Sequence, residues 1–282
     1  KNLIRVLMSA EISKTKQDLW NLLPEWKASY GLIGVDWEER VNFERLNKER
    51  LMKVKNAVKE TGVDLLLLLS DENIRYAIGW RTHMGPVPHI GFNVLAITRD
   101  GDVFFHTYDV ELAKKNLTWE HINIKLLTPW AAKWVREIRE EIGFQPKVIA
   151  VDLYDPSLEN VLRSEFTNAS FISGKDIMAK AKLIKTKDEI ELLKIAAAIT
   201  EAGYWVAVNM IRPGVRENEI LGEVWKTFAY LGAEWTQCSN LVVSGPYTAP
   251  YRRFTSDRVI QFGDLVIVDI GAGYNGYWGD WT

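Results

Sequence analysis

The chain has 282 residues with 35 basic and 37 acidic side chains, so its formal net charge is −2. Hydrophobic residues make up 47% and charged residues 26%, a globular mixture that excludes a disordered or fibrous chain. The balanced charge argues against a dedicated nucleic-acid-binding protein. The single cysteine, Cys238, excludes an intrachain disulfide and favours a reducing, cytoplasmic location. No apolar run approaches the roughly 20 residues of a membrane-spanning helix, so no membrane association is expected.

The first part of the chain changes character after residue 44. Residues 1–44 carry tryptophans among charges with only patchy helical periodicity, so they are expected to form an N-terminal extension. Apolar residues at helical spacing then predict a helix that ends at Gly62, a residue suited to a left-handed cap. Residues 63–69 predict a buried strand, and residues 70–73 a polar turn after it.

Helix and strand alternate over the following hundred or so residues. Residues 92–97 and 103–108 are predicted to form two strands joined by a hairpin turn. An amphipathic helix is expected over 130–142, a short strand over 148–153, and a helix over 156–166 that starts with proline. This alternation predicts an α/β domain over residues 45–178.

A second domain, of the α+β type, is expected over residues 179–282. Thr186 and Glu189 have the spacing of a capping box, in which each side chain bonds the other residue's backbone amide. Apolar spacing behind them predicts a long helix to about Met210, and a further helix is predicted over 217–230. Beyond it the sequence changes to strands and turns.

The most informative pattern lies in the last strands. Asn275-Gly276 between two strand-like runs predicts a type I′ hairpin turn, because both central residues of that turn need positive φ. In the resulting register Asp280 lies opposite Gly271. Asp269 precedes Gly271 by two residues, so both carboxylates point to the same face. They become diagonal neighbours, about 7–8 Å apart at the backbone.

Two interpretations of this carboxylate pair compete. Asp269 ends an otherwise apolar run, and a buried carboxylate usually requires pairing or a metal ion. Two acids at this separation can reach the same pair of ions, which in two-metal sites lie roughly 3.5–4 Å apart. The alternative is that Asp269 and Asp280 are strand-end residues bonded to backbone amides. Their shared face favours the metal interpretation.

This end of the chain resembles a known family. Residues 268–272, 276–277 and 280–282 are similar to the metal-binding hairpin of the pita-bread metallopeptidases, in which two aspartates lie eleven positions apart, as Asp269 and Asp280 do. The family contains methionine aminopeptidase, aminopeptidase P and prolidase, with creatinase as a non-metal relative. Upstream segments resemble it in the same order: residues 73–76, 182–190 and 212–219.

The resemblance implies a creatinase-like α/β N-terminal domain followed by an α+β pita-bread catalytic domain. It implies two divalent metal ions, each held in part by Asp269 and Asp280, and a metal-bridged hydroxide that attacks a carbonyl carbon. Carboxylate ligands suit manganese, iron, cobalt or zinc without selecting one. The implied activity is that of a metal-dependent hydrolase similar to Xaa-Pro aminopeptidase or prolidase, acting on a small peptide or amide. The family resemblance also implies a homodimer.

Two departures from the family pattern matter. The family's His and two Glu ligands follow the hairpin, at positions beyond Thr282, so the chain is expected to contain the catalytic domain only in part. The family also places a His where this chain has Tyr251 or Arg252, depending on the alignment. Tyr can donate a hydrogen bond and Arg can hold a carboxylate, so both are candidate catalytic residues.

The missing His leaves two alternatives to the hydrolase. One is a non-peptidase relative, creatinase-like or dimethylsulfoniopropionate-lyase-like, that cleaves a C–N or C–S bond of a small zwitterion. The other is a catalytically silent binding protein of the same fold. The four histidines, at positions 83, 89, 106 and 121, all fall in the N-terminal domain and are interpreted as structural.

Overall fold

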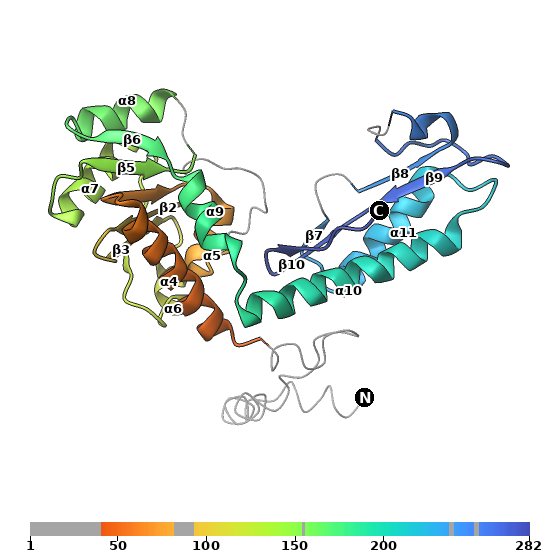
Figure 1. Cartoon of the computed structure of the whole chain (residues 1–282), viewed down its shortest axis with the longest axis horizontal. Coiled ribbons are helices and arrows are strands. Elements are labelled where there is room, and N and C mark those ends of the chain that lie inside the picture. The colour runs from red at the N-terminus through yellow and green to blue at the C-terminus, as the bar shows by residue number, and fades with distance from the viewer. Residues whose placement is uncertain (1–40, 82–92, 154–155, 237–239, 251–253) are drawn as a thin grey trace, which may run out of the picture. The chain divides into compact units, whose positions relative to one another are not determined.

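The structure, a computed structural model, divides into two compact units (Figure 1). The first unit comprises Asn42–Lys194 and Gly273–Trp278, and the second is built on Ile195–Ala272 and Gly279–Thr282. The structure describes residues 41–81, 93–153, 156–236, 240–250 and 254–282. The predicted extension over residues 1–44 therefore lies almost wholly outside the described residues.

A six-stranded mixed sheet forms the centre of the first unit (Figure 1). The strand order is β4-β3-β2-β1-β5-β6, and β2 is antiparallel to both of its neighbours while the other neighbouring pairs are parallel. The strands are β1 (Leu65–Leu68), β2 (Asn93–Thr98), β3 (Val103–Thr107), β4 (Asn123–Leu126), β5 (Val148–Val151) and β6 (Ser170–Ser173). The all-leucine strand β1 is buried throughout, as expected for a strand covered on both faces.

Helices cover both faces of this sheet and create two separate cores. On one face Leu66 and Leu68 pack with apolar residues of α4 (Phe43–Thr61), α5 (Asp71–Ile78), α6 (Val110–Asn116) and α9 (Lys175–Leu183). On the other face Leu65 and Leu67 pack with α7 (Ala131–Ile142) and α8 (Pro156–Glu165). The alternation follows from the two-residue period of a strand and makes the first unit a three-layer α/β structure.

The boundaries of α4 follow from its capping residues. The Asn42 side chain accepts a hydrogen bond from the Arg45 amide at 2.9 Å, so the helix begins at Phe43. Gly62 ends the helix with a φ of 72°, which confirms the predicted left-handed cap. The predicted polar turn at residues 70–73 is wrong, because Asp71 and Glu72 form the acidic first turn of α5.

His106 has the structural role that the sequence suggested. Its side chain is fully buried on β3, and its Nε2 lies 2.9 Å from Glu141 Oε2 on α7. His121 follows α6 in a connecting segment, and positions 83 and 89 lie outside the described residues.

Beyond the six-stranded sheet and the helices that cover it, the described residues form two further α-helices and several short strands (Figure 1). Helix α10 (Lys187–Met210) begins with the predicted capping box: the Thr186 amide donates to Glu189 Oε2 at 2.8 Å, and the Glu189 amide donates to Thr186 Oγ1 at 3.3 Å. Helix α11 (Glu217–Tyr230) follows. Strands β8 (Leu241–Ser244) and β9 (Val266–Asp269) pair antiparallel, and a three-stranded sheet has the order β11-β10-β7. Its strands are β7 (Trp235–Thr236), β10 (Ala272–Tyr274) and β11 (Tyr277–Trp278).

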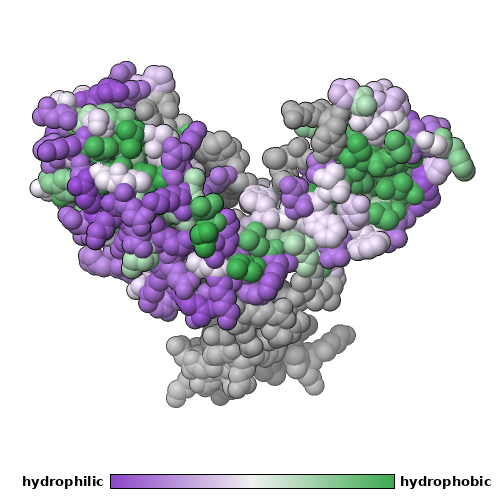
Figure 2. All heavy atoms as spheres, viewed as in Figure 1, coloured by the Kyte–Doolittle hydropathy of each residue, from purple (hydrophilic) through white to green (hydrophobic). Residues whose placement is uncertain are grey.

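Large apolar side chains remain exposed on the second unit, where Figure 2 shows apolar areas. Phe262, Phe254 and Leu265 have exposed fractions of 94%, 81% and 76%. Apolar surface of this kind is typical of a contact surface for other protein segments. None of the helices in the described ranges is both long enough and apolar enough to cross a membrane.

Candidate metal site and its supporting network

The predicted hairpin turn is present at Asn275-Gly276. Both residues have positive φ, 48° for Asn275 and 82° for Gly276, as a type I′ turn requires. Tyr274 pairs with Tyr277, and Gly273 pairs with Trp278. The turn therefore joins β10 and β11 in the predicted register.

Hydrogen bonds beyond the strands extend this register to the end of the described chain. The Gly279 amide donates to the Ala272 carbonyl at 3.0 Å. Ile270 and Trp281 exchange both of their backbone hydrogen bonds, at 2.9 and 3.0 Å. Asp280 lies between these two rungs, so it is opposite Gly271, as the sequence predicted.

Asp269 and Asp280 consequently point to one face of the hairpin. Asp269 ends β9 and is partly buried, whereas Asp280 is exposed. The Thr282 hydroxyl donates to Asp269 Oδ1 at 3.2 Å, which brings Thr282 onto the same face. The shared face is confirmed by the register; the role of the two carboxylates as metal ligands stays a prediction.

The donor chemistry of the pair fits a divalent metal ion in part. Carboxylate oxygens are hard ligands of the kind that manganese, iron, cobalt and zinc accept. Among the described residues, however, no cluster of three or more His, Cys, Asp or Glu side chains could hold a metal ion. The two carboxylates by themselves are fewer than the three or more ligands of such a cluster.

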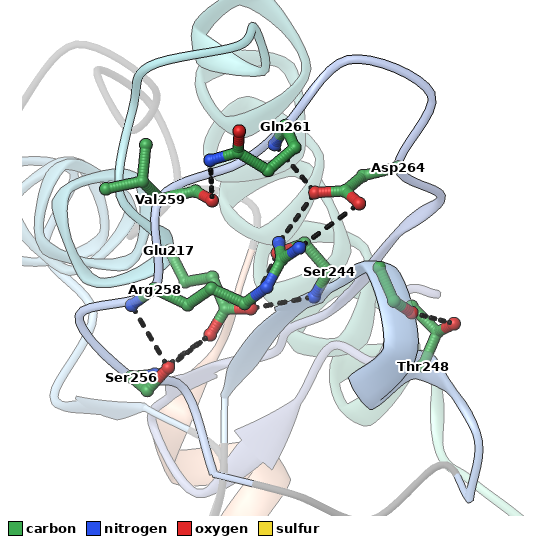
Figure 3. A network of polar contacts seen from close by, with 9 residues as sticks. Glu217, Ser244, Thr248, Ser256, Arg258, Val259, Gln261 and Asp264 are labelled. Carbon is green, nitrogen blue, oxygen red and sulfur yellow. Dashed lines mark hydrogen bonds and ion pairs between the residues drawn. The ribbon is translucent and has the colours of Figure 1, made fainter.

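The two candidate catalytic residues, Tyr251 and Arg252, lie outside the described residues. The segments on either side of them are described. Strand β8 ends at Ser244 and is followed by the short helix η2 (Gly245–Thr248), and on the other side Phe254 and Ser256 are described. A buried polar network holds Ser244 and Ser256 together (Figure 3).

Glu217 is the centre of this network. Its side chain is fully buried at the first position of α11. One carboxylate oxygen accepts from the Ser244 amide at 2.8 Å and the Ser244 hydroxyl at 2.7 Å. The other accepts from the Ser256 amide at 3.1 Å and the Ser256 hydroxyl at 2.8 Å. Burial acts to raise the pKa of Glu217, but the four hydrogen bonds outweigh it and the pKa is lowered.

Arg258 and Asp264 extend the network (Figure 3). Arg258 donates to Asp264 Oδ2 at 2.6 Å and Oδ1 at 3.2 Å, and a further Arg258 hydrogen bond goes to the Ser244 hydroxyl. The hydrogen bond from Arg258 lowers the pKa of Asp264. A Cβ atom on Gly245 would lie 2.5 Å from Asp264 Oδ1, and the φ of Gly245 is 57°, so the position requires glycine.

No local pattern in the sequence indicates that these residues form a network. Glu217 stood out only as part of a segment that resembles the family, and Ser244, Ser256 and Arg258 lie up to 41 positions from it. The geometry shows that Glu217 fixes both ends of the segment that carries Tyr251 and Arg252.

Two family profiles match the chain in order. Residues 50–182 match the profile described as "Creatinase/Prolidase N-terminal domain", and residues 191–282 match "Metallopeptidase family M24". The chain therefore contains a match to the creatinase/prolidase N-terminal domain followed by a match to metallopeptidase family M24. The resemblance drawn from the hairpin and the fold class inferred from it are thereby confirmed.

Individual relatives and solved structures agree with this assignment. The chain is 25% identical over 235 residues to the Xaa-Pro dipeptidase of Pyrococcus furiosus, covering 83% of this chain and 64% of that protein. It is 31% identical over 114 residues to the Xaa-Pro aminopeptidase of Escherichia coli, covering 40% of this chain and 26% of that protein. The structure of an Xaa-Pro dipeptidase from Bacillus anthracis superposes with a TM-score of 0.69 at 27% identity, covering 83% of this chain and 63% of that one.

The matches cover only part of the length of the relatives. The chain spans about 64% of the length of the curated dipeptidase relatives it matches. The chain therefore corresponds to only part of each of these peptidases.

Proposed function

We propose that this chain is part of a metal-dependent peptidase that cleaves a small Xaa-Pro peptide or a related amide. The observation that carries the proposal is the pair Asp269 and Asp280 on one face of a hairpin whose register is closed by hydrogen bonds on both sides of Asp280. The dipeptidase and aminopeptidase relatives support the choice of substrate class.

The proposed roles divide between the hairpin and the neighbouring segment. Asp269 and Asp280 would hold two divalent ions, of manganese, iron, cobalt or zinc, together with further ligands. Such ions lower the pKa of water and polarise a carbonyl oxygen. Tyr251 or Arg252 would contact the substrate in the place of the family's His. Glu217 would position the segment that carries them.

The domain boundaries, the oligomeric state and the location that we propose are those expected from the sequence. We place the domains at residues 45–178 and 179–282, after an N-terminal extension over 1–44, and we expect a homodimer in the cytoplasm. A non-peptidase relative acting on a small zwitterion is the second candidate, because Tyr251 and Arg252 stand where a peptidase of this family has His.

Metal binding tests the central element of the proposal. The protein that carries this chain is expected to bind about two Mn²⁺ per chain. Replacing Asp269 or Asp280 with Asn should weaken Mn²⁺ binding by at least about tenfold, because each change removes an anionic ligand. The matched control is Asp257→Asn, which changes an exposed aspartate of the same unit. Equal Mn²⁺ affinity in Asp269→Asn and Asp257→Asn would contradict the assignment.

A substrate panel separates the two enzymatic candidates. Xaa-Pro dipeptides and tripeptides are compared with betaine-like and guanidino compounds in the Mn²⁺-loaded protein. Turnover of the peptides supports the peptidase, whereas cleavage of a zwitterion alone supports the non-peptidase relative. Protein that binds no metal and turns over neither class would be the silent member of the fold.

A further inference from the structure

Two side chains outside the motifs hold the backbone between the two aspartates. Asn240, which directly precedes β8, accepts a hydrogen bond from the Gly271 amide at 2.7 Å. Thr200, which lies in α10, accepts one from the Ala272 amide at 3.0 Å. Both side chains are buried, with exposed fractions of 7% for Asn240 and 0% for Thr200.

These two hydrogen bonds hold opposite edges of the strand that contains Gly271 and Ala272. Gly271 and Ala272 are consecutive residues that follow Asp269 closely, and consecutive amides of an extended strand point to opposite edges. Asn240 therefore holds the edge toward β8, and Thr200 holds the edge toward the strand that carries Asp280. The backbone that follows Asp269 is therefore hydrogen-bonded to side chains at both of its edges.

The contact with Thr200 replaces one rung of the hairpin ladder. The Gly279 amide donates to the Ala272 carbonyl, but the Ala272 amide donates to the Thr200 hydroxyl, which in turn donates to the Ala196 carbonyl at 2.8 Å. A Cβ atom on Gly279 would lie 2.2 Å from Thr200 Oγ1 and 2.7 Å from the Ala196 carbonyl oxygen. Helix α10 is thus packed directly against the residue that precedes Asp280.

One atom of the Asn240 side chain is in an environment that lowers the stability of the fold. Its Nδ2 is buried and has no hydrogen-bond partner within the described part of the chain. An unpaired buried donor destabilises a fold, and local costs of this kind concentrate at functional sites.

We propose that Thr200 and Asn240 are positioning residues that set the spacing of Asp269 and Asp280 for metal binding. The proposal rests on the metal-binding role proposed above. Neither residue contacts the ion. They fix the two strands against α10 and β8, so that the carboxylates are pre-arranged before the metal binds.

The test uses the protein that carries this chain, with Mn²⁺ as the probe and EPR detection of the free ion. Thr200→Val keeps the shape but removes the acceptor of the Ala272 amide, and should weaken Mn²⁺ binding about tenfold. Thr200→Ser keeps the hydroxyl and should stay within about threefold of wild type. Asn240→Leu, which removes the acceptor of the Gly271 amide, should behave like Thr200→Val.

A second readout is independent of metal. Without metal, backbone hydrogen exchange at Gly271 and Ala272 should be faster in Thr200→Val and unchanged in Thr200→Ser. The matched control is Thr227→Val in α11. The Thr227 hydroxyl donates to the Glu223 carbonyl at 2.8 Å, which is the same intrahelical bond, and the Thr227 side chain is only partly buried. This control should keep wild-type Mn²⁺ affinity and wild-type exchange at Gly271.

The outcomes separate this inference from the proposed function. Wild-type protein that binds no Mn²⁺ overturns the metal proposal and the positioning role together, while the exchange data still report whether Thr200 holds the hairpin. Wild-type binding with equal loss in Thr200→Val and Thr200→Ser overturns the positioning role alone. If Thr200→Val does not fold, Thr200→Ala removes the same acceptor and is judged by the same criteria.

Discussion

At the residue scale, the surroundings of the Glu217 carboxylate lead to a specific prediction about stability. Its carboxylate accepts hydrogen bonds from the amides and hydroxyls of Ser244 and Ser256 in a fully buried position. Glu217→Gln places an amide donor against an N–H and a hydroxyl. We expect the free energy of unfolding to fall by about 2–3 kcal/mol, measured by urea denaturation at neutral pH.

The control for this prediction is the same change two positions later. Glu219 is exposed and accepts a hydrogen bond from the Arg216 amide at 3.1 Å, which a Gln oxygen can also accept. Glu219→Gln should therefore change the stability by less than about 0.5 kcal/mol. A similar loss in both variants would show that Glu217 has no special role.

The pH dependence of Glu217 has a defined sign. Its folded-state pKa lies below the ordinary value of 4.5, so the unfolded chain binds the proton more readily. The stabilisation is fully present above pH 4.5 and is lost as the pH falls through the folded-state pKa. The stability difference between wild type and Glu217→Gln should therefore shrink in acid.

At the scale of elements, Gly222 marks a weak point in α11. It lies inside the helix, and an added Cβ atom would have no neighbour within 4 Å. Gly222→Ala should raise the free energy of unfolding by about 0.5–1 kcal/mol, because alanine loses less backbone entropy on helix formation. Thermal unfolding measures the effect.

Gly214 provides the matched control for this substitution. An added Cβ atom there also meets nothing within 4 Å, but the φ of Gly214 is 92°, a conformation that alanine adopts at a cost. Gly214→Ala should therefore lower the stability. The same sign of change at both positions would contradict the entropic explanation.

The N-terminal ends of α4 and α10 are linked by an ion pair in which the acidic partner is buried. Arg45 donates to both oxygens of Asp188 at 2.8 Å, and the Asp188 side chain is fully buried whereas Arg45 is partly exposed. Arg45→Met leaves the Asp188 carboxylate with the Asn42 amide, 3.1 Å away, as its remaining described partner. The free energy of unfolding should fall, because a buried carboxylate loses its cationic partner, but by less than for a pair with both partners buried, because Arg45 reaches solvent.

Lys48→Met is the corresponding control on the same helix. Lys48 forms an exposed ion pair with Glu44 at 2.5 Å, four residues apart, and such pairs contribute about 0.3–0.5 kcal/mol. Urea denaturation of both variants should show the larger loss for Arg45→Met. In the background Asp188→Asn, the effect of Arg45→Met should become small, since the buried charge is gone.

The elements that sequence patterns predicted are those with strong local signals. Helices α4, α7, α10 and α11 have clear apolar periodicity, and the first three end or begin at recognisable capping residues. No sequence pattern predicts strands β4 and β6, because they are sheet-edge strands that expose most of their side chains and so lack alternation. No clear apolar stripe predicts helix α9, because lysines are spread among its apolar residues.

The candidate site also has one part that the sequence predicts and one part that it does not. The register of Asp269 and Asp280 could be predicted because a two-residue turn fixes it locally through Asn275 and Gly276. The contacts of Thr200 and Asn240 with the same hairpin could not, because they join residues 72 and 31 positions apart. Such pairs depend on how the elements pack, which no local pattern encodes.

At the scale of the whole molecule, buried tyrosines should limit stability in alkali. Burial raises the pKa of Tyr277 to about 12, and burial raises the pKa of Tyr76 as well. The Tyr277 hydroxyl donates to Glu189 Oε1 at 3.1 Å, a bond that needs the protonated phenol. A group whose folded-state pKa is raised contributes stability below its unfolded pKa, here near 10, and loses it as the pH rises through the folded-state value.

Tyr277→Phe tests this alkaline limb directly. The variant loses the bond to Glu189 and should be about 1 kcal/mol less stable than wild type at pH 7. Between pH 10 and 12 its stability should fall less steeply, by up to about 1.4 kcal/mol per pH unit, because one titrating group has been removed. The matched change Tyr230→Phe alters a tyrosine that is 74% exposed and should keep the wild-type slope. If urea denaturation across this range gives the same slope for both variants, ionisation of Tyr277 is not coupled to folding.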